Sequence, residues 1–511
     1  MSETYQRLAK DFCTTDDVQG VALPTDKSHL KAWVSLLPRA NPIETASMLY
    51  SGLVKSSVVK MNGSSRFPLL ELLREAAIDS IAWLERQFVG GTLPLAKERY
   101  AFAPLAINLQ IVLADSYRLA SYEICAPAGA IPMFKTSQIN AALARSQWHY
   151  LQALHLNWKL YRSCPKGVWL SMHRVYQFAK HINLEGKDVE DPILSKLVQI
   201  EHIYNEASLA SLMNPLAFPQ AGQESLKTLA ASFAPHCSIS LHAQTEKSVK
   251  LPIDADLPVN ADLPNSEVLF FTFSALLKDI ETLSYENKDE NFNISITKGQ
   301  YLSMPVTVLL KVKRSLGIAL DRSHKRQFEP YPIQTIVGFN NLHYFVAGQI
   351  DFNDYMQQLS QMSGHGLNLS AEWMNINTDS SSHITIPAVA LDHSLGGYCI
   401  HWPIHTSLRV RIGEVIGLNI QSPDAVPDWM VAVIRWLRYE QDGTVVAGLE
   451  LISRRCHSVA LRIHQNKQIG SLMRGLELEP LEDELPRRFL MSGRLEGNQQ
   501  QVEVLYSYEP H

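Results

Sequence analysis

The sequence predicts an α+β multidomain protein, in which an N-terminal helical domain precedes a C-terminal antiparallel β region that is a closed barrel or a sandwich. A chain of 511 residues is too long for one hydrophobic core, so two to four domains are expected. Apolar residues recur at three- and four-residue spacing between about 28 and 235, which is typical of packed helices. Beyond 332, short β-branched runs alternate with turn residues, which favours strands.

Composition narrows the classes of function. Hydrophobic residues make up 46% and charged residues 19%, as in ordinary globular proteins. The formal net charge of −5 argues against a chain that coats a nucleic acid polymer. Six cysteines lie apart without a C-x-x-C pair, which excludes a zinc ribbon and suits a reducing compartment. With no signal peptide and no run of roughly 18 apolar residues, we expect a cytoplasmic protein with no membrane span.

The N-terminal half is expected to be helical after a polar, flexible arm at 1–27. The segment Phe67–Leu84 illustrates the helical domain at 28–235: Pro68 suits a first helical turn, and the apolar residues after it line one face. Further helical stretches are expected at 102–122, 136–162, 167–182, 192–212 and 223–233. Pro and Gly interrupt the pattern between several of them, as at 126–132.

Residues 236–320 form a small α/β segment by the same criteria. We expect a strand at 237–243, a Pro-rich linker or surface loop at 251–264, a strand and then a helix over 267–283, and a helix at 304–320.

Seven strand-like runs follow, within a β region placed at 321–456. They lie at 333–339, 385–391, 398–402, 408–412, 415–420, 429–439 and 444–452. Gln441-Asp-Gly443 is typical of a hairpin turn, and residues 351–381 interrupt the strands with a possible helix at 355–362. The C-terminal extension, 457–511, is expected to add a hairpin around 494–506.

Two short motifs, 66 residues apart, frame the start of this β region. Arg322-Ser-His-Lys-Arg326 is an R-x-x-x-R sequence, and Asp392-His-Ser394-Leu-Gly-Gly397 is a D-x-S-x-x-G sequence. Either alone is most often ordinary, since paired arginines usually lie on a solvated face and Asp-Ser-Gly closes many turns. Together, in this order and with strands on both sides of the second, they point to one site.

This combination resembles the signature of the PilZ domain, a small β-barrel that binds cyclic di-GMP. The similarity covers roughly 320–456, with a longer gap between the motifs than is typical. It implies a PilZ-like barrel and ligand contacts for Arg322, Arg326, Asp392, Ser394 and Gly397. These residue types suit the ligand: guanidinium forks bind phosphate and guanine O6 and N7, a carboxylate accepts from the guanine N–H groups, and glycine permits close approach.

The expected function is therefore that of a receptor rather than an enzyme. Cyclic di-GMP would bind where the arginines join the barrel to the helical domain, which would rearrange and bind a protein partner; whether one or two ligand molecules bind stays open. No metal and no further cofactor are expected. The alternatives are a ligand-independent interaction scaffold with a degenerate barrel, and an enzyme site hidden among the helices.

Other constellations favour structural roles. His401 and His405 are four residues apart but belong to a strand and turn rather than to a helix. His149 and His155 lie among tryptophans and tyrosines, which favours helix packing over a cofactor site. The phosphate-loop, dinucleotide-binding and serine-hydrolase motifs are missing from the sequence.

Overall fold

The fold is described from a computed structural model of the chain. The structure describes residues 3–12, 20–90, 95, 99–127, 129–260, 267–281, 283, 291–297, 299–316, 326–362, 383–403, 408–420, 428–440, 442–465, 468–481, 488–491 and 500–506. The chain forms two compact units, Met1–Leu320 and Asp321–His511, and each is described by itself.

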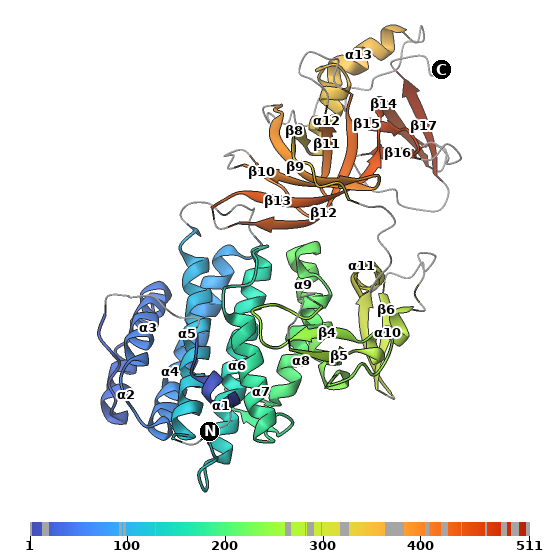
Figure 1. The fold of residues 1–511 in the computed structure, drawn as a ribbon. Helices are drawn as coiled ribbons and strands as arrows, with labels where there is room; N and C mark the ends of the chain where they lie inside the picture. Colours follow the sequence, from blue (N-terminus) through green and yellow to red (C-terminus); the bar gives the residue numbers. More distant parts are fainter. Residues whose placement is uncertain are drawn as a thin grey trace. The chain divides into compact units, whose positions relative to one another are not determined.

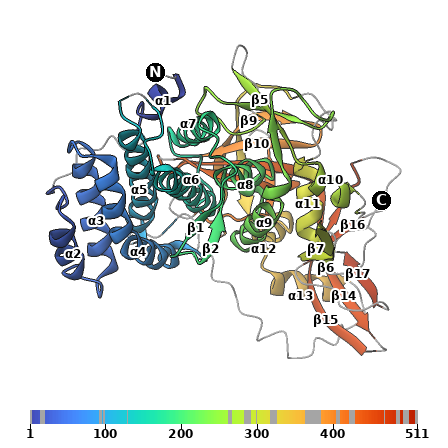
Figure 2. The ribbon, with the colours of Figure 1, turned by 90° about the horizontal axis from the view of Figure 1, so that it is seen from below.

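Long helices build the first unit (Figure 1). They are α2 (Lys27–Ser35), α3 (Pro42–Ser57), α4 (Gly63–Phe88), α5 (Phe102–Ile124), α6 (Thr136–Lys159), α7 (Val168–His181), α8 (Ile200–Leu212) and α9 (Gln220–Phe233). Viewed nearly end-on, α3, α5 and α6 lie side by side (Figure 2). Helices α5 and α6 are buried around most of their circumference. The sequence of α5 is mainly apolar, whereas α6 also buries polar side chains such as Arg145 and His149.

A polar cap marks the start of α2, and a side-chain hydrogen bond accommodates the proline inside α4. Asp26 caps α2 by accepting hydrogen bonds from the N–H groups of Ser28 and His29. Helix α4 begins at Gly63, earlier than expected, so Pro68 lies inside it rather than in its first turn. Pro68 cannot donate to the carbonyl of Ser64 four residues before it, and the side-chain amide of Gln138 donates to that carbonyl instead, over 3.0 Å.

Two other expectations for this unit are wrong. Within the supposed flexible arm, residues 3–8 form α1 (Glu3–Leu8), whose Tyr5 and Leu8 are buried. Tyr5 stacks on Tyr122 of α5 at 4.6 Å between ring centroids, a contact that the local sequence does not reveal. Where a helix was expected from 192, the chain forms the hairpin of β1 (Val189–Asp191) and β2 (Lys196–Val198).

The α/β segment completes the core of this unit. Strands β3 (Ser238–Ser240), β5 (Val268–Thr272) and β4 (Val249–Pro252) pair antiparallel in that order, and β6 (Asn291–Thr297) pairs with β7 (Gln300–Pro305). Helices α10 (Ser274–Glu281) and α11 (Val306–Leu316) accompany them. Leu251, Phe271 and Leu309 belong to the same buried cluster as the helices. The β4 strand begins the stretch expected as a loop, and the β6–β7 hairpin was not expected.

The second unit contains a closed six-stranded barrel. Its order is β10 (Gly397–Trp402), β13 (Val445–Ser453), β12 (Met430–Tyr439), β11 (Val415–Asn419), β8 (Tyr331–Val337) and β9 (Ile386–Ser394), and all pairs are antiparallel. The expected turn joins β12 to β13, where Gly443 has a φ of 85° and donates to the carbonyl of Glu440. Residues 408–411 are not a strand. Gly413 turns the chain with a φ of 85° and donates to Ile434, so ladder pairing starts only at β11.

The insertion between β8 and β9 packs against the C-terminal extension. Among its described residues are two helices, α12 (Phe339–Val346) and α13 (Phe352–Met362). Helix α13 corresponds to the helix expected at 355–362, α12 precedes the segment expected to interrupt the strands, and residues 363–381 of that segment lie outside the described residues. The extension is a four-stranded antiparallel sheet, β16 (Arg488–Met491), β15 (Gln468–Leu478), β14 (Cys456–Gln465) and β17 (Gln500–Tyr506), and not merely a final hairpin. The Tyr355 hydroxyl donates to the carbonyl of Ser458 over 2.7 Å. Insertion and extension thus share two buried clusters: Leu342 of α12 packs with Leu476 of β15 in one, and Leu359 of α13 packs with Ala460 of β14 in the other.

Candidate ligand site on the barrel

The two sequence motifs meet at the end of strand β9. Nη1 of Arg326 donates to Oδ1 of Asp392 over 2.5 Å. The backbone fixes this meeting, because the neighbouring residues Gln327 and His393 exchange two N–H···O hydrogen bonds of 2.9 and 3.1 Å. The Asp392 side chain is 12% exposed and that of Arg326 is 32% exposed, so the ion pair lies partly out of water. A partly buried pair resists salt screening better than an exposed one.

A tight turn places the rest of the second motif beside this pair. Ser394 ends β9 and pairs with Gly397, which begins β10, and the Ser394 hydroxyl lies 3.5 Å from the carbonyl of Gly397. The carbonyl of Gly396 accepts a hydrogen bond from the N–H of Leu451 over 2.9 Å, which holds the turn against β13. A Cβ at 397 would come within 2.1 Å of the Leu449 carbonyl oxygen, so the β10–β13 pairing requires glycine there.

Asp392 faces outward from the barrel. Cys399 pairs with Asp392 on one side and with Gly448 on the other, and cross-strand partners project from the same face. The next residue, Ile400, pairs with Ala390 and Ala447, and all three are fully buried, so they face the interior. The candidate site therefore lies on the outer surface of β9, β10 and β13.

Strand β12 adds an indole and, beside Arg326, a second arginine to this surface. Trp436 lies opposite Gly448, and its Nε1 would be 1.9 Å from a Cβ at that position, so the indole lies flat on the glycine. Arg438 lies two residues further along the same face. Burial and then Asp392 raise the pKa of the Cys399 thiol on this face, whereas Arg326 and Arg438 act to lower it.

Aromatic rings fill the barrel interior behind the motifs. The ring of His393 stacks on Tyr398 at 5.9 Å and meets the edge of Tyr331 at 5.6 Å. Burial and then the Tyr398 hydroxyl raise the pKa of Tyr331 to about 12, so its phenol stays neutral. Nδ1 of His393 is buried and has no hydrogen-bond partner within the described part of the chain. These rings lie on the interior side of the strand segment that carries Asp392 and Ser394.

The structure thus brings together four of the five predicted site residues, namely Arg326, Asp392, Ser394 and Gly397; Arg322 lies outside the described residues. Sequence reasoning missed Trp436 and Arg438. A signal for Trp436 exists in the sequence, since a glycine in the middle of the predicted strand 444–452 often marks close approach by another group. The glycine alone does not show which side chain occupies the space above it.

The histidines that the sequence analysis predicted to be structural lie in the helical core or in a barrel strand, where the structure describes them. His149 is fully buried and bonded to Arg74 and Gln110. Burial and then the charges of Arg74 and Arg145 hold its pKa well below the usual value. His401 pairs with Val389 and Val446 in the barrel, and His405 lies outside the described residues.

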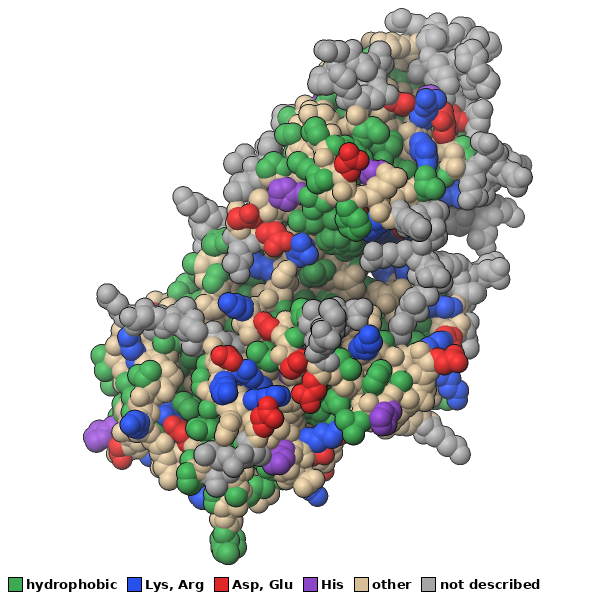
Figure 3. Space-filling model, viewed as in Figure 1, with side chains coloured by type: hydrophobic (Ala, Val, Ile, Leu, Met, Phe, Trp, Pro, Cys, Tyr) green, Lys and Arg blue, Asp and Glu red, His purple; other side chains and the backbone are tan. Residues whose placement is uncertain are grey.

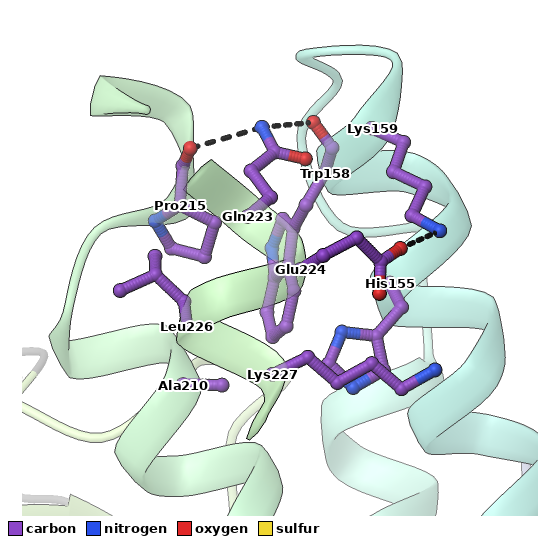
Figure 4. Close-up of a pocket in the computed structure, with 9 residues that line it drawn as sticks. All are labelled: His155, Trp158, Lys159, Ala210, Pro215, Gln223, Glu224, Leu226 and Lys227. Carbon is purple, nitrogen blue, oxygen red and sulfur yellow. Dashed lines mark hydrogen bonds and ion pairs between the residues drawn. The ribbon is translucent and has the colours of Figure 1, made fainter. Parts of the chain in front are cut away.

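His155 lines a small pocket of about 10 Å³ between α6 and α9 (Figure 4). Lys159 and Lys227 both line this pocket, and Lys159 contacts the carboxylates of both Glu85 and Glu224, so its charge is already neutralised. The amide of Gln223 spans the other side and donates to the carbonyls of Trp158 and Pro215, each over 3.0 Å. We assign no function to this pocket.

No helix in the described ranges is both long and apolar enough to cross a membrane. In those ranges, no three His, Cys, Asp or Glu side chains gather in a way that could hold a metal ion.

Comparisons with known proteins match almost the whole length of the chain. Residues 27–245 match the model of the N-terminal domain of the cyclic-di-GMP receptor FimW. Residues 259–383 and 372–457 match that of its middle PilZ domain. The chain is 23% identical to the cyclic-di-GMP receptor FimW of Pseudomonas aeruginosa, an alignment that covers 89% of this chain and 82% of the relative. No solved structure gives a significant match.

The match to the PilZ model starts at 259, well before the barrel expected from 321. It therefore takes in strands β5 to β7, although these pack into the core of the helical unit. The match agrees with the closed barrel and with the contact of Arg326 and Asp392: through its C-terminal barrel, the chain belongs to the PilZ-domain family.

Proposed function

We propose that this protein is a cyclic di-GMP receptor whose ligand binds on the outer barrel face around Arg326 and Asp392. The observation that carries the proposal is their 2.5 Å contact, which joins the two motifs at one place. The relative that matches 89% of the chain is itself named a cyclic-di-GMP receptor.

The residues of this face match the groups of the ligand. The guanidinium of Arg326 offers planar forked donors to a phosphate or to guanine O6 and N7. The Asp392 carboxylate accepts from guanine N–H groups, and the Ser394 hydroxyl donates to a phosphate. Gly397 lets the ligand approach the backbone. We assign Arg322 the same kind of contact as Arg326, on the strength of its place in the motif.

Binding on this face must rearrange the Arg326–Asp392 ion pair, because both groups are hydrogen-bonded to each other. A ligand that offers an anion to the arginine and donors to the aspartate gives each group a new partner when their mutual hydrogen bond breaks. A simple anion replaces only one and leaves the carboxylate unpaired, at a cost. The ion pair thus favours a ligand that carries phosphate and guanine edges together.

We further propose that ligand binding is coupled to the helical domain and to a protein partner. Arg322 and Arg326 follow the boundary between the two compact units at 320 and 321. A ligand that holds these arginines against the barrel restrains the junction and shifts the population of domain arrangements. Small-angle scattering with and without cyclic di-GMP would test the coupling, which fails if saturating ligand leaves the scattering curve unchanged.

Isothermal titration calorimetry of the full-length chain with cyclic di-GMP tests the binding itself. We expect binding heat for the wild type and its loss in R326A. Arg411 provides the matched control, because it is 85% exposed in its side chain and is bonded to Glu414 near the opposite end of β8; R411A should bind as wild type does. Absence of heat from a folded wild-type chain would overturn the receptor proposal and favour the ligand-independent scaffold.

A further inference from the structure

The connection between α5 and α6 ends in an exposed apolar tip. Met133 is 80% exposed and Phe134 is 94% exposed, among the highest values for large apolar side chains in the described residues. Figure 3 shows hydrophobic side chains at the end of the projection at the bottom of the view, below the α5–α6 end of the helices in Figure 1. These two side chains contribute little to the stability of the fold, because they stay in water and bury little apolar surface.

The backbone at this tip is strained. Phe134 has a φ of 63°, in the left-handed region that a bulky residue rarely adopts. The N–H of Lys135 donates to the carbonyl of Pro132 over 3.2 Å and closes a turn around it. Strain at an aromatic residue that is almost fully exposed points to a role outside the folded chain.

The base of the same connection is firmly packed, so the tip is presented on a rigid support. Gly129 donates to the carbonyl of Cys125 over 2.8 Å, and a Cβ at 129 would lie 2.6 Å from the ring of Tyr5. Ile131 packs against the helical core. The projection is therefore limited to residues 132–134.

Positive charge and a further apolar residue lie on the adjoining connection between α3 and α4. The Gln138 amide donates to Ser64, which joins the start of α6 to the start of α4. The α3–α4 connection contributes Val58, which is 82% exposed, and the exposed Lys60. Residues 58–66 and 124–137 contain no acidic residue. The nearby carboxylate of Glu123 is already bonded to Arg66 over 2.7 Å.

We propose that this end of the helical domain, defined by Val58, Lys60, Met133, Phe134 and Lys135, attaches the protein to an anionic lipid surface. Two or three apolar side chains are too few for a stable protein interface, which buries about 800 Å² per partner. They suffice for shallow insertion below lipid headgroups, where the lysines meet negative charge. The attachment is peripheral and independent of the proposed ligand site.

Co-sedimentation of the full-length protein with lipid vesicles, without nucleotide, tests this proposal. The wild type should sediment with vesicles of equal parts phosphatidylcholine and phosphatidylglycerol. It should sediment less with phosphatidylcholine alone, and salt should weaken binding to the mixed vesicles. The double variant M133S/F134N should lose at least about tenfold in partitioning. Asparagine tolerates the left-handed backbone, so this variant keeps the turn.

The control variant is L36S. Leu36 is 81% exposed, like Met133, but lies at the opposite end of α3, and this variant should bind as the wild type does. The proposal is overturned if the wild type stays in the supernatant, as it would if the tip fits a protein pocket instead. It is also overturned if M133S/F134N sediments like the wild type, or if neutral and anionic vesicles bind equally. None of these results bears on cyclic di-GMP binding.

Discussion

Arg326 and Asp392 lie 66 residues apart in the sequence and form a 2.5 Å hydrogen-bonded ion pair on the barrel surface. The contact is set by an isolated bridge between the next two residues, Gln327 and His393. A segment that precedes the first barrel strand is thus held in register with the end of the second. The contact therefore fixes the position of the Arg326 guanidinium, so that its planar pair of N–H donors, and not only its charge, can meet a ligand.

Arg326→Lys should weaken cyclic di-GMP binding nearly as much as removal of the side chain, by at least about tenfold. Lysine keeps the positive charge but cannot donate two parallel hydrogen bonds to a phosphate or a guanine edge. Calorimetry of R326K beside R326A and wild type measures the difference. If R326K binds like wild type, charge alone explains the role of this residue.

Gly397→Ala should destabilise the barrel by about 2 kcal/mol or more, because the new methyl group would meet the Leu449 carbonyl oxygen at 2.1 Å. Urea unfolding gives the free-energy change. Ser394→Ala is the matched variant, since it removes a hydroxyl from the same turn without a clash. It should unfold like wild type while binding the ligand more weakly. Equal unfolding of G397A and wild type would contradict the close approach of β10 and β13.

Asp191→Asn should lower the stability of the helical unit by about 3–5 kcal/mol. The Asp191 carboxylate accepts two hydrogen bonds from Arg74, of 2.8 and 2.9 Å, and lies 3.0 Å from Arg145, all in the buried core. Its loss leaves the buried Arg74 without its carboxylate partner and leaves Arg145 with only the more distant carboxylate of Glu71, 3.7 Å away. The exposed Asp188 on the neighbouring loop supplies the control, D188N, which should change little. Similar unfolding curves for both variants would refute the central role of this ion cluster.

The same cluster should make stability fall in acid. Burial acts to raise the pKa of Asp191, but hydrogen bonding and charge from Arg74, with the charge of Arg145, outweigh it and hold the pKa below its usual value. The stabilisation is therefore complete above the unfolded pKa, near 4, and is lost as the pH falls through the lower folded pKa. Urea unfolding between pH 7 and pH 3 should show a steeper loss for wild type than for D191N.

Removal of residues 457–511 should destabilise the barrel unit by at least about 4 kcal/mol, since several large apolar side chains of α12 and α13 would be exposed. Leu342, Tyr355 and Leu359 are at most 3% exposed against the C-terminal sheet. Thermal unfolding and solubility of the shortened chain measure the effect. A chain that lacks only 507–511 serves as control, and equal melting of the two would contradict a shared core.

Local sequence patterns predicted the helical domain, the barrel strands and the hairpin turn at Gly443, because each depends on periodicity or on one residue's backbone freedom. They failed where distant contacts decide the outcome. Tyr5 orders a polar arm by stacking on Tyr122. Gln138 satisfies the carbonyl that Pro68 cannot, so α4 starts earlier. The C-terminal sheet was missed because its cover, α12 and α13, comes from an insertion more than a hundred residues earlier in the chain.

The sequence by itself determined the fold class, the PilZ resemblance and the residue types that a guanine nucleotide requires. Tertiary structure decided which of them meet. Strand register turns Asp392 outward beside Cys399 and Gly448, while the bridge at Gln327 carries Arg326 to it. Tertiary structure also packs Trp436 against Gly448 and holds the exposed Phe134 in a left-handed backbone conformation. Such placements depend on pairings between strands and on contacts between distant segments, and no local pattern records them.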